Sequence, residues 1–149
     1  MLRSHRWRTA ENSAGYLLPH LSRGQRLLDV GCGPGTITVD LARRLAPGLV
    51  VGLDREDRPL REARAYAVGA DPGNVTFQIG DLYRLPCLYD SFDVVHAHQV
   101  LQHLSDPVAA LVEMQRVCRP GGCAARDADY TAMTWYPYDP RLDRWLELY

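Results

Sequence analysis

The sequence predicts an α/β fold built on a parallel sheet, and three observations support this prediction. Apolar runs of strand length alternate along the chain with segments whose apolar residues recur at helical spacing. One run ends in three closely spaced glycines that open a helix, a common ligand-binding turn in open α/β sheets. The 149 residues contain no internal repeat or low-complexity linker. We therefore expect one domain over residues 1–149.

The first third of the chain predicts a helix, a strand and a second helix. Residues 8–21 place their apolar side chains on one side of a helix. Residues 26–30 form a short apolar run that stops at the glycines, as a buried strand would. Residues 36–45 again follow helical spacing, and Thr36 is a suitable N-cap for them. The apolar positions of the two helices are Ala10, Ala14, Leu17, Leu18 and Leu21, and Ile37, Leu41, Ala42 and Leu45.

The middle of the chain predicts three further strands. They cover residues 49–53, 75–79 and 92–97, and each is a short run rich in β-branched or aromatic residues. A helix over residues 56–68 separates the first two of them. Gly69 follows that helix and would close it, because glycine readily adopts the left-handed conformation of a helix C-terminus.

The last part of the chain predicts a helix, a weak fifth strand and a final helix. Asp106 followed by Pro107 is a usual start of a helix, which we expect to continue to about residue 118. A Pro-Gly-Gly turn then leads into a strand over residues 123–128, whose small and polar residues give it low β-propensity. A further helix begins at about residue 141. It reaches Tyr149 without a capping residue, so we expect the natural chain to continue.

The glycine-rich segment is the most informative part of the sequence. Asp29 precedes the turn, and Gly31, Gly33 and Gly35 follow in the pattern D-x-G-x-G-x-G. A dinucleotide fold favours G-x-G-x-x-G, whereas position 36 is threonine here. A carboxylate before the turn suits an ammonium group and would repel a pyrophosphate. The segment therefore favours a nucleotide-like ligand that carries an amine.

Two further carboxylates follow the next strands. Asp54 comes at the end of the second strand, where a carboxylate can accept hydrogen bonds from both ribose hydroxyls. Asp81 follows the third strand and could accept the adenine amino group. Each residue alone could be a solvated strand-end or turn aspartate. Three successive strands with such endings at one sheet edge indicate a binding site.

The chain resembles the class I S-adenosylmethionine-dependent methyltransferases over about residues 24–125. The closest pattern is that of the quinone-biosynthesis and small-molecule enzymes. The stretches that carry the resemblance are LLDVGCGPGTITVDLA, VVGLD, VTFQIGDLYRLP and SFDVVHAHQVLQHLSDPVAALVEMQRVCRPGG.

This resemblance implies S-adenosyl-L-methionine as cofactor and assigns its contacts residue by residue. The first motif would surround the methionine part, the second would hold ribose and adenine, the third would hold adenine, and the end of the fourth strand would lie beneath the sulfonium. An N-terminal lid would bring one arginine to the cofactor carboxylate. The residues are, in that order, Asp29, Gly31, Cys32, Gly33, Pro34 and Gly35; Asp54 and Arg55; Gly80, Asp81 and Leu82; Ala97 and His98; and Arg6, Trp7 and Arg8.

The resemblance also implies a Rossmann-like, doubly wound sheet. The family sheet has seven strands in the order 3-2-1-4-5-7-6, and this chain supplies the five strands 3-2-1-4-5. The last two strands carry part of the acceptor site and would be missing. An open edge at the fifth strand would then favour a homodimer.

His98 is the candidate general base, because it ends the fourth strand and histidine suits proton transfer near neutral pH. A role in packing alone is the alternative reading, and it applies equally to His96 on the same strand face and to His103 in the next turn. Asp127 and Asp129 could face the acceptor or be solvated turn residues. Further along, the aromatic residues Trp135, Tyr136 and Tyr138 could line an acceptor pocket or belong to the core.

The bulk composition restricts the partners. The net charge is −1 from 17 basic and 18 acidic residues, which disfavours nucleic acid and anionic membranes. Four cysteines without a C-x-x-C pair predict no metal site. The sequence also lacks an apolar segment typical of a signal peptide. Four thiols in such a chain favour a reducing compartment, and we therefore expect a cytoplasmic protein.

Three functions follow from these observations. The first is methyl transfer to a small-molecule acceptor that the sequence does not identify. The second is a non-catalytic S-adenosylmethionine-binding or interaction module, favoured by the missing strands. The third is an NAD-binding oxidoreductase, which Asp29 and Thr36 disfavour.

Overall fold

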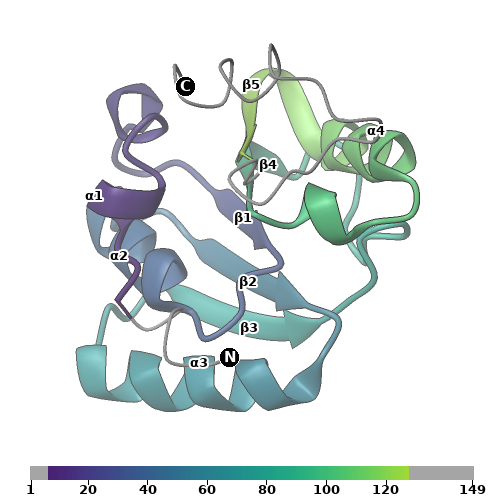
Figure 1. The fold of residues 1–149 in the computed structure, drawn as a ribbon. Coiled ribbons are helices and arrows are strands. Elements are labelled where there is room, and N and C mark those ends of the chain that lie inside the picture. The colour runs from purple at the N-terminus through teal and green to yellow at the C-terminus, as the bar shows by residue number, and fades with distance from the viewer. Residues whose placement is uncertain (1–6, 128–149) are drawn as a thin grey trace, which may run out of the picture.

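The computed structural model describes residues 7–127, which form a five-stranded parallel sheet with helices on both faces (Figure 1). The strand order is β3-β2-β1-β4-β5, as the sequence analysis predicted. The strands are β1 (Leu27–Val30), β2 (Val50–Asp54), β3 (Val75–Ile79), β4 (Phe92–His98) and β5 (Cys118–Asp127). The helices are α1 (Ala10–Ser13), α2 (Thr36–Leu45), α3 (Asp57–Ala70) and α4 (Pro107–Val117), with 3₁₀ turns at Leu18–His20 and Leu101–His103. None of these helices is long and apolar enough to span a membrane.

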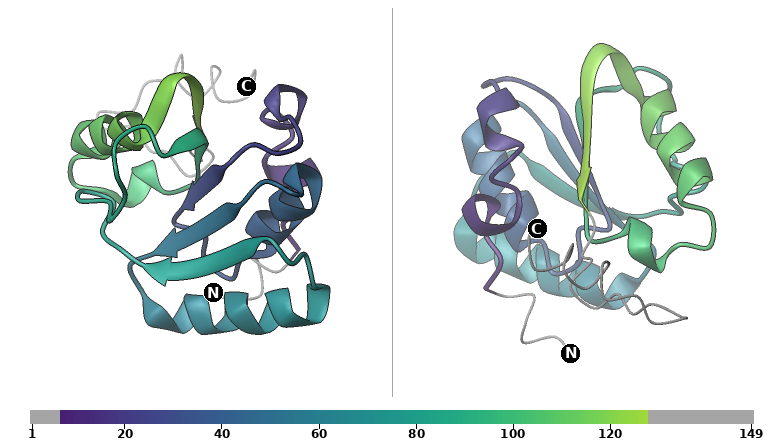
Figure 2. Two further views of the ribbon diagram at one scale, coloured as in Figure 1. Left: turned by 180° about the vertical axis from the view of Figure 1, so that it is seen from behind. Right: turned by 45° about the horizontal axis from the view of Figure 1, so that its top comes forward.

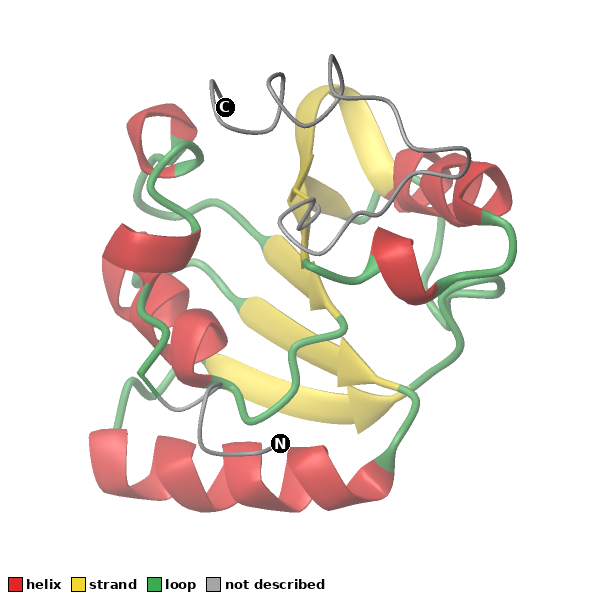
Figure 3. Ribbon diagram, in the orientation of Figure 1, coloured by secondary structure: helices red, strands yellow, loops and turns green. Residues whose placement is uncertain are grey.

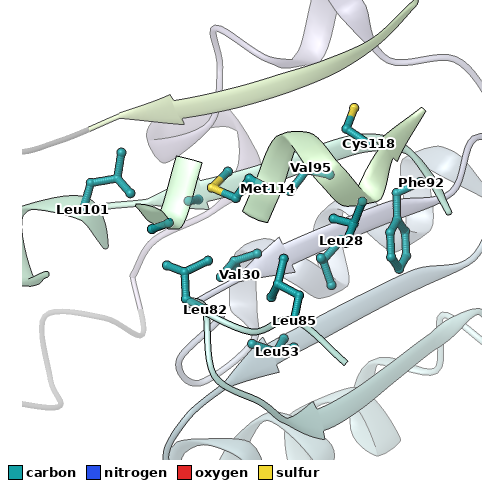
Figure 4. Packing of buried hydrophobic residues seen from close by; sticks show 13 residues of the cluster. Leu28, Val30, Leu53, Leu82, Leu85, Phe92, Val95, Leu101, Met114 and Cys118 are labelled. Atoms are coloured by element: carbon teal, nitrogen blue, oxygen red, sulfur yellow. The ribbon is translucent and has the colours of Figure 1, made fainter. Parts of the chain in front are cut away.

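Alternation along the central strands supplies a separate apolar core to each face of the sheet. Leu27 of β1 and Val94 of β4 turn to one face, where they pack against α1 and α2. Their neighbours Leu28 and Val95 turn to the other face, which α4 covers. In Figure 2 the sheet lies between the helices α1 and α2 on one face and α4 on the other. Figure 4 shows the core on the α4 face, where the Met114 side chain packs against the strands.

The opening helix predicted over residues 8–21 is wrong in its length. The structure has one turn of helix, α1, followed by a bend and a separate 3₁₀ turn. Thr9 and Asn12 form a capping box that starts α1. Pro19 has no N–H to donate to Gly15, so an α-helix cannot be hydrogen-bonded through this segment. The predicted apolar residues Ala10, Ala14 and Leu17 are nevertheless fully buried.

Two predicted helix ends are also corrected. Gly35, in the left-handed conformation at φ +77°, takes the N-cap place of α2 that was predicted for Thr36. The helix α3 continues through Gly69, and Asp71 adopts the left-handed conformation at its end with φ +43°. By contrast, the predicted cap of α4 is confirmed, since the Asp106 side chain accepts a hydrogen bond from the Ala109 N–H at 2.9 Å.

The last strand begins earlier than predicted. β5 starts at Cys118, directly after α4, and its pairing with β4 is shifted between Phe92 and Val94. The Pro-Gly-Gly segment lies inside this irregular stretch. Predictions for residues 1–6 and 128–149 lie outside the described residues, as does the side chain of Asp127. They concern Arg6, Asp129, Trp135, Tyr136, Tyr138 and the helix from about residue 141.

The parallel direction of the strands places the loops that follow β1, β2 and β3 at one edge of the sheet, where the arrowheads meet in Figure 3. β4 runs parallel to β1 and ends beside the same loops. Residues that are far apart in the sequence are thus brought together at this edge.

Candidate functional site

A cavity of about 660 Å³ opens at the carboxyl edge of the sheet. Its volume lies in the range of sites that bind small molecules. The walls come from the N-terminal segment, the loop after β1, the end of β2, the loop after β3 and the end of β4.

Backbone hydrogen bonds anchor the glycine loop, residues 31–35, to the end of β2. The N–H groups of Gly31 and Cys32 both donate to the carbonyl of Leu53, at 2.7 and 3.0 Å. Gly31 has a φ of +68°, and a Cβ there would lie 2.3 Å from Val100 Cγ2, so only glycine fits. Gly33 has a φ of +53° but no atom near its Cβ position. Its backbone can therefore be approached closely by a ligand.

Asp54 is tied to the glycine loop. Its Oδ2 accepts a hydrogen bond from the Gly33 N–H at 3.1 Å, and its Oδ1 accepts one from the Glu56 N–H at 3.0 Å. These two bonds orient the carboxylate at the cavity wall. Since a carboxylate has about four acceptor positions, it retains the capacity to bind ligand hydroxyls.

Asp81 begins the opposite wall, in the β3–β4 loop of residues 80–91. Its Oδ1 accepts a hydrogen bond from the Tyr83 N–H at 2.9 Å, while no described residue donates to its Oδ2. Gly80, Leu82 and Tyr83 line the cavity beside it. The wall thus combines an apolar surface with one available carboxylate oxygen.

Side chains of α4 hold this loop in place. Glu113 Oε2 accepts from the Leu85 N–H at 3.0 Å, while the Arg116 guanidinium donates to the carbonyls of Leu85 and Cys87 at 3.1 and 3.0 Å. Arg116 also donates to Glu113 at 2.8 Å. The hydrogen bond from Arg116 is the main reason that the pKa of Glu113 is lowered.

Asp29 is almost completely buried and has two protein partners. Its Oδ2 accepts from the Thr38 hydroxyl at 2.6 Å, and its Oδ1 lies 2.8 Å from His96 Nδ1. The other ring nitrogen of His96, Nε2, lies 3.1 Å from the Tyr16 hydroxyl. Asp29 also lines the cavity. Its carboxylate is therefore fixed by buried groups beneath the predicted amine position.

The end of β4 and the N-terminal segment meet across the cavity. Arg8 donates a hydrogen bond from Nη2 to Gln99 Oε1, and both residues line the cavity. Gln99 has a φ of +52°, which is unusual for a residue other than glycine. His98 and His103 line the same region. Two histidines and an arginine are thus gathered at this end.

The structure brings most of the predicted site residues to the cavity. Two differ. Gly35 is turned away from it, since a Cβ there would lie 2.7 Å from Ala63 Cβ and 3.0 Å from the Phe77 ring. Ala97 is fully buried in the core beneath α4. Those that line the cavity are Asp29, Gly31, Cys32, Gly33, Pro34, Asp54, Arg55, Gly80, Asp81, Leu82 and His98.

Cys32 contributes to the cavity without an ionised thiol. Burial raises the pKa of its thiol strongly, and the nearby carboxylates of Asp29 and Asp54 raise it further. The thiol is therefore neutral at physiological pH. Backbone contact, as predicted for Cys32, is consistent with this environment.

Sequence reasoning missed the partners of Asp29. Alternation along the strand predicts only that His96 shares a face with His98, whereas the pairing of β1 with β4 places His96 directly opposite Asp29. Two polar residues at the centres of apolar strands were the available signal, because buried polar groups need partners. Tyr16 and Thr38 carried no such signal, since their positions depend on how the N-terminal segment and α2 pack.

Comparison with known proteins gives a consistent result. The family described as methyltransferase domain matches residues 21–145. An uncharacterized methyltransferase of Schizosaccharomyces pombe is 40% identical over 97% of this chain and 54% of its own length. A ubiquinone biosynthesis O-methyltransferase of Hahella chejuensis is 38% identical over 66% of this chain and 40% of its own length. The chain thus spans about half the length, or less, of these two relatives.

A solved structure shows the same fold. The crystal structure of a SAM-dependent methyltransferase from Aquifex aeolicus matches with a TM-score of 0.74. The match covers 89% of this chain and 72% of that one, at 21% sequence identity. This likeness concerns the arrangement of strands and helices.

Proposed function

The chain belongs to the class I S-adenosylmethionine-dependent methyltransferases, and from this premise we propose that it transfers the methyl group of S-adenosylmethionine to a small-molecule acceptor. One observation carries the proposal: the glycine loop, Asp54 and Asp81 line one cavity. These are the three features that the sequence placed after successive strands.

The residues present fit the cofactor. Gly33 has open space at its Cβ position, which lets a ligand approach the loop, and Asp54 offers fixed acceptor positions for the ribose hydroxyls. The available Oδ2 of Asp81 suits an amino group on the adenine ring, and Leu82 supplies apolar contact. Each part of the ligand thus has a matching wall.

The amino-acid end of the cofactor has its own pair of charges. Arg8 lines the cavity and can bind the carboxylate, as the sequence analysis expected of one N-terminal arginine. Asp29 lies on the glycine-loop side and can accept from the ammonium group. Opposite charges at the two positions suit a zwitterion.

The bound cofactor supplies an electrophilic methyl group, and the protein aligns the acceptor with it. His98 is the candidate base for an acceptor that must lose a proton, since it lines the cavity at the end of β4. His103 lies in the same region and is the alternative. Substituting each histidine singly distinguishes which of the two acts as the base.

The remaining expectations stay predictions. They are a cytoplasmic location, a homodimer through the β5 edge, and the absence of nucleic-acid or membrane partners. A non-catalytic cofactor-binding module is the second candidate function. Turnover separates it from the first.

The decisive first experiment is calorimetric titration with S-adenosylhomocysteine, with NADH as the control ligand. Micromolar binding of the first ligand alone is expected. Transfer of labelled methyl groups to a panel of phenols, amines and thiols then tests catalysis. Binding of NADH alone would overturn the proposal, whereas cofactor binding without transfer to any acceptor would favour the module. If His98→Asn binds the cofactor but no longer transfers methyl groups, while His103→Asn still transfers them, His98 is the base.

A further inference from the structure

A chain of hydrogen-bonded polar groups crosses the face of the sheet that α1 and α2 cover. It links the Tyr16 hydroxyl, the His96 ring, the Asp29 carboxylate and the Thr38 hydroxyl, with separations of 3.1, 2.8 and 2.6 Å. His96 has no exposed surface, whereas Tyr16 is 44% exposed. The chain therefore connects the outside of the N-terminal segment to a carboxylate at the cavity wall.

The direction of each hydrogen bond follows from the groups themselves. An ionised carboxylate only accepts, so Thr38 donates to Asp29 Oδ2 and His96 donates from Nδ1 to Oδ1. In a neutral ring the other nitrogen, Nε2, is then an acceptor, and the Tyr16 hydroxyl donates to it. All the donors point toward Asp29. A neutral His96 ring in this arrangement is therefore the Nδ1–H tautomer.

The N-terminal segment, residues 7–21, is attached to the rest of the domain at several points. The Ala10 N–H donates to Asp40 Oδ2 at 3.2 Å, and Glu11 pairs with Arg44 of α2. Tyr16 attaches the same segment to β4 through His96. Arg8, at the start of the segment, lines the cavity. A displacement of this segment would therefore affect both Arg8 and the bond that orients His96.

We propose that His96 is a positioning residue that fixes the Asp29 carboxylate for the ammonium group of the cofactor, and that Tyr16 makes this depend on the placement of the N-terminal segment. The inference rests on the proposed function. Without the His96 donor, Asp29 would keep Thr38 as its partner and could turn about that bond. The ammonium group would then meet a less ordered carboxylate.

Two ligands isolate the effect at the amino-acid end. S-adenosylhomocysteine carries the ammonium and carboxylate groups, whereas 5′-methylthioadenosine has the same adenosine and thioether without them. The ratio of their dissociation constants reports the amino-acid end alone. A general loosening of the site changes both constants together.

The variants grade the loss. His96→Leu removes both hydrogen bonds, whereas the amide of His96→Asn can keep a donor near the Nδ1 position and loses only the link to Tyr16. Tyr16→Phe removes the same link from the other side. Tyr66→Phe is the matched control, since Tyr66 lies on α3 and is 43% exposed.

We expect S-adenosylhomocysteine to bind about 10-fold more weakly to His96→Leu, and about 3-fold more weakly to Tyr16→Phe and His96→Asn. Binding of 5′-methylthioadenosine should change by less than about 2-fold in all variants. Equal losses for both ligands, or no loss in any variant, would overturn the inference. Failure of both ligands to bind the unsubstituted chain would overturn the proposed function and this inference with it.

Nitrogen NMR of the His96 ring gives a test that does not depend on the ligand. The proton should reside on Nδ1, and the Nε2 resonance should move in Tyr16→Phe but not in Tyr66→Phe. A proton on Nε2 in the neutral ring would contradict the assigned direction of the hydrogen bonds. Because Tyr16→Phe removes only one atom, it keeps the test available even if His96→Leu does not fold.

Discussion

The two walls of the cavity are built in different ways. The glycine loop is held by backbone groups close in the sequence or on the neighbouring strand, such as Gly35 N–H to the Cys32 carbonyl at 3.1 Å. The β3–β4 loop is instead held by side chains of α4, about 30 residues later in the chain, chiefly Glu113 and Arg116. The first wall is held mainly by backbone groups of the loop and of the adjacent strand β2, with one bond to the Asp54 side chain. The second wall depends on side chains of a helix that follows later in the chain.

This difference predicts distinct responses to substitution. A motif whose backbone conformation admits only glycine should fail abruptly when a side chain is added. A loop held by several separate hydrogen bonds should weaken by degrees, because each bond contributes modestly on its own. Substitutions in the two walls therefore test whether the loops differ in this way.

Gly31→Ala is expected to have the largest effect. Its Cβ would overlap Val100, and its φ of +68° is unfavourable for alanine. Overpacking and backbone strain together should lower the free energy of unfolding by about 3 kcal/mol. Chemical denaturation monitored by circular dichroism measures the change.

Gly24→Ala is the matched control for Gly31→Ala. Gly24 has a φ of +88°, but no atom lies within 4 Å of its Cβ position. It should therefore show only the conformational cost, about 1 kcal/mol. Equal destabilisation by the two substitutions would mean that the contact with Val100 does not restrict the loop.

The contrast between the walls also explains what the sequence could predict. The strands themselves, the glycine loop and the carboxylates Asp54 and Asp81 follow from local patterns, whereas the strand order was expected from the family resemblance. The structure places these site residues together. Asp29 was recognised too, but its partners were not, because His96 and Tyr16 come from distant segments. The support of the β3–β4 loop by α4 was missed for the same reason: hydrogen bonds from side chains to the backbone of a distant loop leave no periodic signal.

Asp54→Ala should have the next largest effect, on ligand binding. The substitution removes the acceptor for Gly33 and the proposed acceptor for the ribose hydroxyls. We expect the affinity for S-adenosylhomocysteine to fall by more than about 1 kcal/mol in calorimetry. Asp57→Ala is the control, since Asp57 pairs with Arg61 on the surface of α3. If both variants bind equally well, Asp54 has no role in binding.

Glu113→Gln, in the second wall, should lower thermal stability by a smaller amount that depends on pH. The hydrogen bond from Arg116 lowers the pKa of Glu113 in the folded protein. Its contribution to stability is therefore present above the unfolded-state pKa and is lost as the pH falls through the folded-state pKa. The difference in melting temperature between Glu113→Gln and the unsubstituted chain should be largest near pH 7 and should vanish in acid. A difference that does not depend on pH would mean that the charge of Glu113 does not hold the loop.

Tyr83→Phe should have the smallest effect on stability, and hydrogen exchange can assign that effect to single amides. The Tyr83 hydroxyl accepts from the Asp106 N–H at 3.0 Å and lies 3.2 Å from the Ser105 hydroxyl, so it joins the β3–β4 loop to the start of α4. Because the site is partly exposed, water can replace the lost partner. The free energy of unfolding should therefore fall by at most about 1 kcal/mol. Amide hydrogen exchange should nevertheless accelerate at Asp106, while the Leu85 amide, held by Glu113, keeps its protection. Faster exchange at both amides would show that the two attachments of the loop act as one unit, which contradicts the graded response expected of this wall.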